Sequence, residues 1–142
     1  MKQIKRFIPV LIFSFALLTL VSCENKARLV IDKNNASAFL KNYFSIWNEG
    51  KIDSLLTYTH GTDSLSSDQL QRLVKGLNLG REKLIKEHGG IKEIMNIKID
   101  STRGPDAFVS YDVKYFNGLQ TKVNRVLVSE KGKIKLSLRA VN

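Results

Sequence analysis

Residues 107–118, AFVSYDVKYFNG, decide the fold, because they join an alternating run to a strong turn signal. Apolar or aromatic side chains stand at 107, 109, 111, 113 and 115, whereas positions 110, 112 and 114 are polar. Such alternation is typical of a β-strand with one buried face. Both residues of Asn117-Gly118 tolerate the positive φ of a type I′ turn. The stretch therefore predicts a strand that reverses at 117–118 into an antiparallel partner.

The same period of two governs the rest of the chain beyond Gly90. One alternating run precedes the first stretch, with Met95, Ile97 and Ile99 on one side, and a second run follows it at 119–129. A turn at 130–133 leads into a last run at 134–140. These runs predict a four-stranded antiparallel meander with one buried and one wetter face.

Before Gly90 the apolar residues recur with the helical period of 3.6. Helices are predicted at 36–49, where Phe39, Tyr43 and Trp47 form an aromatic stripe, at 52–58, and at 67–88. Residues 59–66 are expected to be a polar loop.

Helix boundaries are predicted from capping residues. Asn34 or Asn35 can cap the first helix and Ser67 the third, while Gly89-Gly90 supplies a left-handed stop. Gly76 and Gly80 lie inside the third helix, where they either permit close packing on another helix or mark a break.

The resulting fold class is α+β, with three N-terminal helices packed on a curved four-stranded antiparallel sheet. Residues 47–56, WNEGKIDSLL, resemble the helix corner of the nuclear-transport-factor-2-like (cystatin-like) domains, in particular those of small domain-of-unknown-function lipoproteins of Gram-negative bacteria. Further matches lie at 89–91, 107–109, 117–118 and 132–136. Two departures are Lys51, where an acid is usual, and Ile134, where Trp is usual.

This resemblance implies a cone, in which the sheet wraps the helices and leaves a pocket between the long helix and the concave face. Relatives use that pocket as an enzyme site, as a ligand site, or not at all. The residues expected at a ligand pocket are Trp47, Tyr111, Val113 and Tyr115.

The N-terminus has the pattern of an export signal. Lys2, Lys5 and Arg6 precede an uncharged run at 7–20, which is too short for a bilayer-spanning helix of about 20 residues. The run ends in Leu20-Val21-Ser22-Cys23, which looks like a lipobox, and Cys23 is the only cysteine. The sequence thus predicts a lipoprotein signal peptide at 1–22, a lipidated Cys23 with a tether at 23–34, and a single domain at 35–142.

Localisation follows from this reading. Acyl chains on Cys23 would hold the chain on a membrane of the cell envelope. Because Glu24 rather than Asp follows the cysteine, resemblance to lipoprotein sorting rules favours the outer membrane, on either of its faces. A cleavable secretory signal or a short membrane helix is the alternative.

Charge patterning argues against a nucleic-acid partner. The formal charge of the chain is +10, and residues 1–22 carry three of its cations and no acid, which leaves +7 on the remainder. These cations are scattered among 13 acids without a dense basic tract. A solvated surface explains them better than a nucleic-acid interface. A second envelope protein or a small ligand is the expected partner.

Catalytic motifs are absent from the sequence. Asp112 could serve as a base beside Tyr43, Tyr111 or Tyr115, but alternation points it away from Tyr111. His60 and His88 stand at separate helix ends, and Ser64, Ser66 and Ser67 lack a nucleophile motif. No metal cluster or cofactor fingerprint is present. The expectation is a non-catalytic binding or accessory domain without metal or cofactor, and a small isomerase-like or hydrolase-like enzyme is the alternative.

Overall fold

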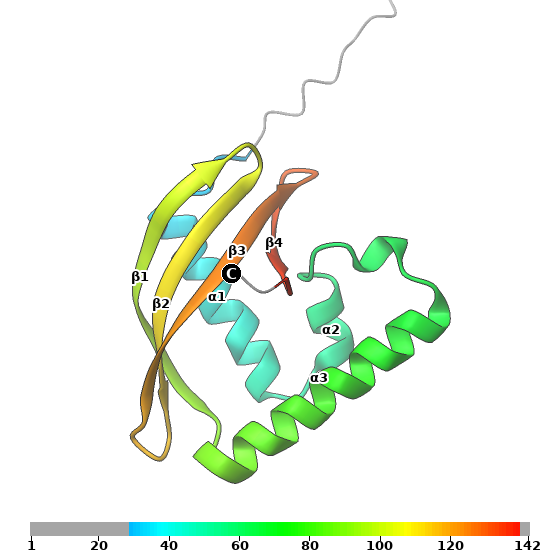
Figure 1. Cartoon of the computed structure of the whole chain (residues 1–142), viewed down its shortest axis with the longest axis vertical. Coiled ribbons are helices and arrows are strands. Elements are labelled where there is room, and N and C mark those ends of the chain that lie inside the picture. The colour runs from blue at the N-terminus through cyan, green and yellow to red at the C-terminus, as the bar shows by residue number, and fades with distance from the viewer. Residues whose placement is uncertain (1–28, 140–142) are drawn as a thin grey trace, which may run out of the picture.

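The computed structural model describes residues 29–139. The elements in chain order are α1 (Lys33–Asn48), α2 (Ile52–Leu56), the 3-10 turn η1 (Thr62–Ser64), α3 (Ser67–His88), β1 (Ile91–Arg103), β2 (Asp106–Tyr115), β3 (Gln120–Glu130) and β4 (Lys133–Ser137) (Figure 1). The predicted signal peptide, Cys23 and the first part of the tether lie outside the described residues.

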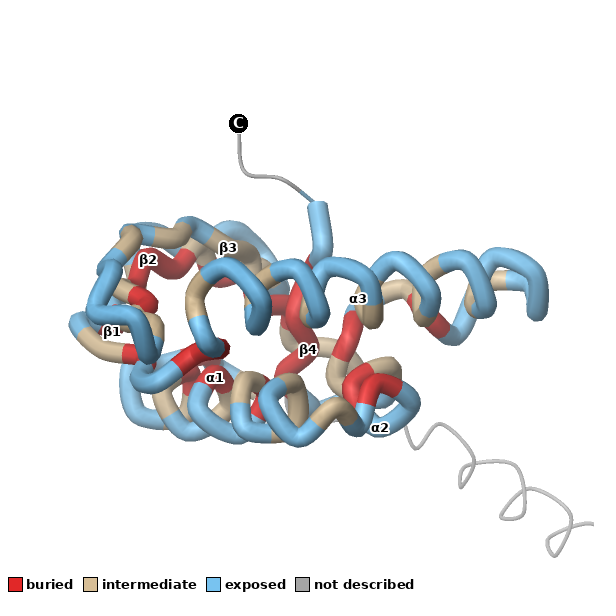
Figure 2. The backbone as a smooth tube through the Cα atoms, turned by 90° about the horizontal axis from the view of Figure 1, so that it is seen from below, coloured by how far each residue is buried: buried red, intermediate tan, exposed pale blue. Residues whose placement is uncertain are grey.

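The four strands form one antiparallel sheet in the order β1-β2-β3-β4, which confirms the predicted meander and the α+β class. The sheet curves around α1, which packs against β1, and α2 joins α1 to α3 (Figure 1). Viewed from below, α1 and α3 lie apart, with β4 between them (Figure 2). The helices therefore cover the concave face from two sides.

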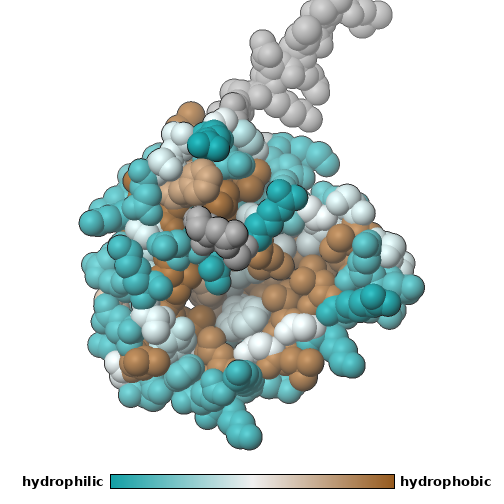
Figure 3. Space-filling model, viewed as in Figure 1, coloured by the Kyte–Doolittle hydropathy of each residue, from teal (hydrophilic) through white to brown (hydrophobic). Residues whose placement is uncertain are grey.

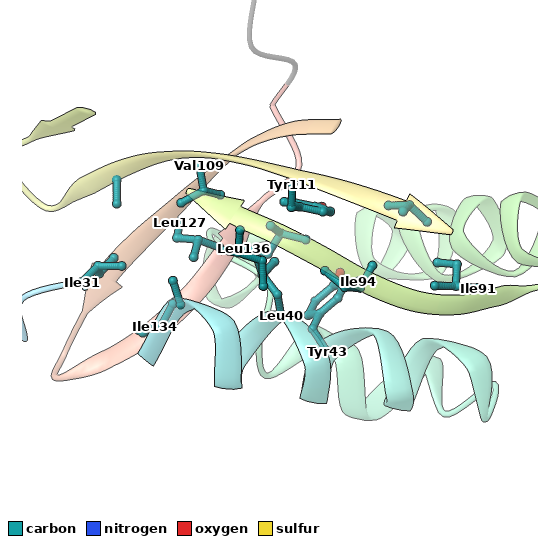
Figure 4. Close-up of a cluster of buried hydrophobic side chains, with 14 of the residues drawn as sticks. Ile31, Leu40, Tyr43, Ile91, Ile94, Val109, Tyr111, Leu127, Ile134 and Leu136 are labelled. Carbon is teal, nitrogen blue, oxygen red and sulfur yellow. The ribbon is translucent and has the colours of Figure 1, made fainter. Parts of the chain in front are cut away.

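One hydrophobic core joins α1 to this face. Tyr43 points from α1 toward the sheet, and Tyr111 lies against β2 above it (Figure 4). Leu40, Leu55 and Leu127 are completely buried. All buried members of the core fall between residues 31 and 136. This stretch therefore carries its own core and meets the criterion for an independently folding domain.

The first helix begins earlier than the predicted position 36, because Asp32 is its N-cap. The Asp32 carboxylate accepts from the N–H groups of Asn34 and Asn35, and the Asn35 side chain accepts from the Asp32 N–H at 2.9 Å. Neither asparagine is thus the cap. Ile31, which the sequence assigned to the tether, is buried in the core.

A β-bulge changes the expected alternation in β1. Asn96 has a φ of 55°, and the pairing with β2 shifts between Met95 and Lys98. The extra residue lets Ile94 and Ile97 face the core together, although they are three positions apart. Met95 is only half-buried, so the predicted Met95-Ile97-Ile99 face is wrong at its first member.

The hairpin between β2 and β3 does reverse at 117–118, but not through a type I′ turn. Only Gly118 has a positive φ, of 89°. Its N–H donates to the Tyr115 carbonyl, and the Tyr115 N–H donates to the Leu119 carbonyl. This pattern fits a longer loop closed by a glycine bulge, in which Asn117 keeps an ordinary conformation.

Helix α3 is continuous through Gly76 and Gly80 and has no buried residue. A Cβ at either glycine would meet no atom within 4 Å, so neither serves close packing. Ser66, not Ser67, caps the helix. Between residues 29 and 139, no helix has the length and apolarity needed to cross a membrane.

The expected polar loop at 59–66 is partly structured, and α2 ends at Leu56, so Tyr58 lies beyond it. Thr59 is buried and forms a parallel bridge with Leu136 of β4. The His60 N–H donates to the Leu136 carbonyl, and the Leu136 N–H donates to the Tyr58 carbonyl, both at 2.8 Å. This segment covers the outer edge of β4, which would otherwise expose unpaired backbone groups.

Candidate functional site

A cavity of about 270 Å³ opens between α1, α3 and the concave face of the sheet. All four residues predicted for a ligand pocket line it: Trp47 from α1, and Tyr111, Val113 and Tyr115 from β2. Apolar surface gathers in a hollow on the face of the molecule seen in Figure 3. The other lining residues are aromatic or aliphatic except for one arginine: Tyr43, Phe44, Leu77, Leu84, Ile91, Val123, Arg125, Leu136 and Leu138.

Arg81 of α3 positions Trp47 at the rim of this cavity. Its Nε donates to the Trp47 carbonyl at 2.8 Å, and its Nη2 donates to the Asn48 carbonyl at 2.7 Å. A cation at a helix C-terminus also interacts favourably with the helix dipole. Gly50 makes room for this contact, because a Cβ there would lie 3.1 Å from the Arg81 guanidinium carbon.

The β2–β3 loop closes the end of the cavity near the C-terminus of α3. The Asn117 N–H donates to the His88 carbonyl, and the Phe116 N–H donates to the Gly90 carbonyl, both at 3.1 Å. The His88 ring lies 4.8 Å from the ring of Tyr115. The end of α3 is therefore held by the loop, whereas its middle covers the cavity without burying a side chain completely.

Aromatic rings form the wall opposite α3. The rings of Tyr43 and Phe44 are 5.5 Å apart, and those of Phe44 and Tyr111 are 6.0 Å apart. Tyr111 is only 1% exposed, and burial raises the pKa of its hydroxyl, with a smaller opposing effect from Arg125. Within the described residues, neither this hydroxyl nor the Trp47 indole N–H has a hydrogen-bond partner. Buried polar groups without a partner are uncommon and call for an explanation.

Arg125 is the charged residue of the cavity, and the sequence reasoning missed it. It pairs with Val109 across β2 and β3, so it shares the concave face with the buried side chains of β2. Its one hydrogen bond among residues 29–139 runs from Nη1 to the Asn124 carbonyl, at 2.9 Å. No carboxylate in that range lies within 4 Å of the guanidinium. Alternation puts Arg125 on one side of the strand with Val123 and Leu127, but the apolar Val126 and Val128 on the other side leave the inward face undecided until pairing with β2 sets it.

The other candidates lie away from the cavity. Asp112 accepts from Asn96 at 2.7 Å and from Gln120 at 3.3 Å on the opposite face of the sheet, as alternation predicted. His60 pairs through Nδ1 with Glu130 at 2.8 Å.

The serines have structural contacts. The Ser64 hydroxyl donates to the Gly61 carbonyl, and the Ser66 hydroxyl accepts from the Gln69 N–H at the start of α3. In the described part of the chain, no group of three or more His, Cys, Asp or Glu side chains is placed to hold a metal ion.

Comparison with known proteins gives a likeness of fold. No protein-family model matches the sequence, and no curated protein matches it significantly. Among matching solved structures is one from Campylobacter jejuni described as a "Putative NTF2-like transpeptidase". It shares 19% identity with this chain at a TM-score of 0.54, and the match covers 75% of this chain and 96% of that one. The curved meander, its three helices and this likeness together identify the architecture as the NTF2-like α+β fold.

Proposed function

We propose that this chain is a non-catalytic binding domain of the cell envelope, which takes a small ligand into the cavity between α3 and the sheet. The observation that supports this most directly is the lining of the cavity. It combines hydrophobic and aromatic side chains with a few polar groups, the usual composition of a ligand site. Its volume of about 270 Å³ lies just below the range for drug-sized ligand pockets, about 300–1,000 Å³, so the ligand is small.

A small enzyme is the second candidate, and the description of the Campylobacter structure motivates it. Acyl transfer of the transpeptidase kind needs a nucleophile beside a general base. The described lining contains no Ser, Thr, Cys, His, Asp or Glu. This composition favours binding over catalysis.

The membrane attachment is proposed from the sequence alone. Cys23, at the end of the lipobox-like run, would carry the acyl chains and anchor the domain, with the outer membrane as the favoured location. Only eight Cα–Cα steps, with seven residues in between, separate Cys23 from Ile31, which packs in the core. At full extension they span about 28 Å, so the domain would stay close to the lipid surface. Its cavity would then serve a ligand or an envelope protein near that membrane.

A cavity-filling substitution tests the binding function. Leu77 lines the cavity from α3, whereas Leu79 on the same helix is 56% exposed and does not line it. In the protein comprising residues 24–142, a neutral apolar fluorophore, N-phenyl-1-naphthylamine, should bind saturably at one site. Leu77→Trp should abolish this binding and Leu79→Trp should retain it. Equal binding by both variants would contradict the proposed site.

An activity panel tests the enzyme alternative. The same protein should show no turnover of esters, glycosides, steroid ketones or peptidoglycan-type peptides. Turnover that is lost in Tyr111→Phe would overturn the non-catalytic proposal.

A further inference from the structure

The polar groups of the described cavity lining whose hydrogen-bonding capacity is unfilled can all donate a hydrogen bond. The guanidinium group of Arg125 offers only donors. The Trp47 indole has a single N–H and no acceptor. The raised pKa of Tyr111 keeps its hydroxyl protonated across the physiological range, so it too can donate. A ligand that satisfies these groups must therefore present acceptors.

The remaining hydroxyls of the lining are already engaged. Tyr115 OH lies 3.2 Å from the Thr121 hydroxyl, and Tyr43 OH lies 3.5 Å from the Thr59 hydroxyl. This leaves Arg125, Tyr111 and Trp47 as the groups of the described lining whose hydrogen-bonding capacity is unfilled. Two of them come from neighbouring strands, because Tyr111 pairs with Val123, two residues before Arg125.

The charge of the lining selects the sign and size of the ligand's head group. With one guanidinium and no acid in the described lining, a cationic head would be repelled. A neutral head would leave Arg125 without a counter-charge. A carboxylate can accept two parallel hydrogen bonds from a single guanidinium and neutralises its one positive charge. A phosphate would bring nearly two negative charges.

We propose that the cavity binds a small amphipathic carboxylate, whose head pairs with Arg125 and accepts a hydrogen bond from Tyr111 while its apolar body packs against the aromatic and aliphatic lining. This assignment rests on the proposed binding function and names its ligand class. It also explains why an arginine stands on the concave face of β3 in a row with Val123 and Leu127.

Octanoate, octan-1-ol and octylamine share an alkyl chain and differ in the charge of the head group. They test whether the cavity prefers a negatively charged head group. Trp47 is the only tryptophan of the chain and lines the cavity, so its fluorescence reports occupancy directly. Titration calorimetry supplies the affinities. In the protein of residues 24–142, octanoate should bind at least about tenfold more tightly than either analogue, because hydrogen bonds to charged groups are the strong ones.

Arg125→Gln should remove this preference, so that octanoate binds no more tightly than octan-1-ol. The matched control is Arg103→Gln, because Arg103 is an exposed arginine on β1 outside the cavity. Tyr111→Phe should weaken octanoate binding by a larger factor than octan-1-ol binding. Thermal melts of each variant check that it remains folded.

The outcomes separate the two proposals. Equal affinity for all three heads, or a preference for octanoate that survives Arg125→Gln, would overturn the carboxylate assignment and leave the binding function standing. Failure of every probe, N-phenyl-1-naphthylamine included, would overturn both.

Discussion

The side-chain amide of Asn48 brackets the main chain of Ile91. Its Nδ2 donates to the Ile91 carbonyl at 2.7 Å, and its Oδ1 accepts from the Ile91 N–H at 3.3 Å. One side chain thus satisfies both backbone groups of the first residue in β1, 43 positions further along the chain. Because Trp47 precedes Asn48 and Ile91 lines the cavity, this contact also sets one corner of the candidate site.

Asn48→Ala should destabilise the domain by about 1–3 kcal/mol, the range for leaving partly buried backbone groups without a partner. Urea denaturation of the protein comprising residues 24–142 measures it. The matched control is Asn42→Ala, an exposed position on α1, which should change stability by less than about 0.5 kcal/mol. Equal losses of stability in both variants would show that the two hydrogen bonds between Asn48 and Ile91 do not stabilise the fold.

Gly76→Ala and Gly80→Ala should each stabilise the domain by up to about 1 kcal/mol, because alanine favours a helix interior and neither position is crowded. Gly118→Ala should act in the opposite direction, by about 1 kcal/mol, because φ there is 89° although the space is equally open. Thermal melts distinguish the two cases. A loss of stability in both helix variants would indicate that α3 needs its glycines.

Acid stability should depend on Glu130. The hydrogen bond from His60 lowers the pKa of this carboxyl below its usual value of 4.5, helped by the nearby Lys135 and opposed by partial burial and by Asp63. Because the folded-state pKa is the lower one, the carboxylate stabilises the fold fully above about pH 4.5, and this contribution declines as the pH falls through the folded-state pKa.

Chemical denaturation between pH 3 and pH 7 checks this linkage. Glu130→Gln should lower stability at neutral pH and flatten the decline on the acid side. Glu93→Gln, an exposed position on β1, serves as the control and should leave the profile unchanged. If the stability of Glu130→Gln fell with decreasing pH as steeply as that of the parent protein, Glu130 would not be the group that causes the decline.

Under the proposed lipid attachment, Cys23→Ser in the full chain should abolish lipidation and release the protein from the membrane fraction, since the thiol of a lipobox cysteine accepts the lipid. Ser22→Ala keeps a small residue before the cysteine and should remain membrane-bound. Metabolic labelling with palmitate and fractionation of cells measure both effects. Retention of a normally processed Cys23→Ser protein in the membrane pellet would show that the attachment is not lipidation at this residue.

The sequence by itself determined the elements and their order. Alternation from 107 to 115 identified both the buried face of β2 and the outward direction of Asp112, because side chains of a strand point to opposite faces in turn. The same rule placed Tyr111, Val113 and Tyr115 on one wall, and the helical period placed Trp47 on the stripe of α1 that faces it. These are local properties, so local patterns predicted them.

Only the tertiary structure decided the rest. The bulge at Asn96 aligns Ile94 with Ile97 against the strand period, because pairing with β2 and burial of both isoleucines outweigh local regularity. Arg125 is a surface residue by type, but its register opposite Val109 turns it inward, and register is set between strands. Arg81 and Asn48 reach partners more than 30 positions away, which no local spacing encodes. The cavity lies beside α3, which the Arg81 hydrogen bonds tie to the C-terminus of α1 and the β2–β3 loop holds at His88, while no side chain of α3 is completely buried.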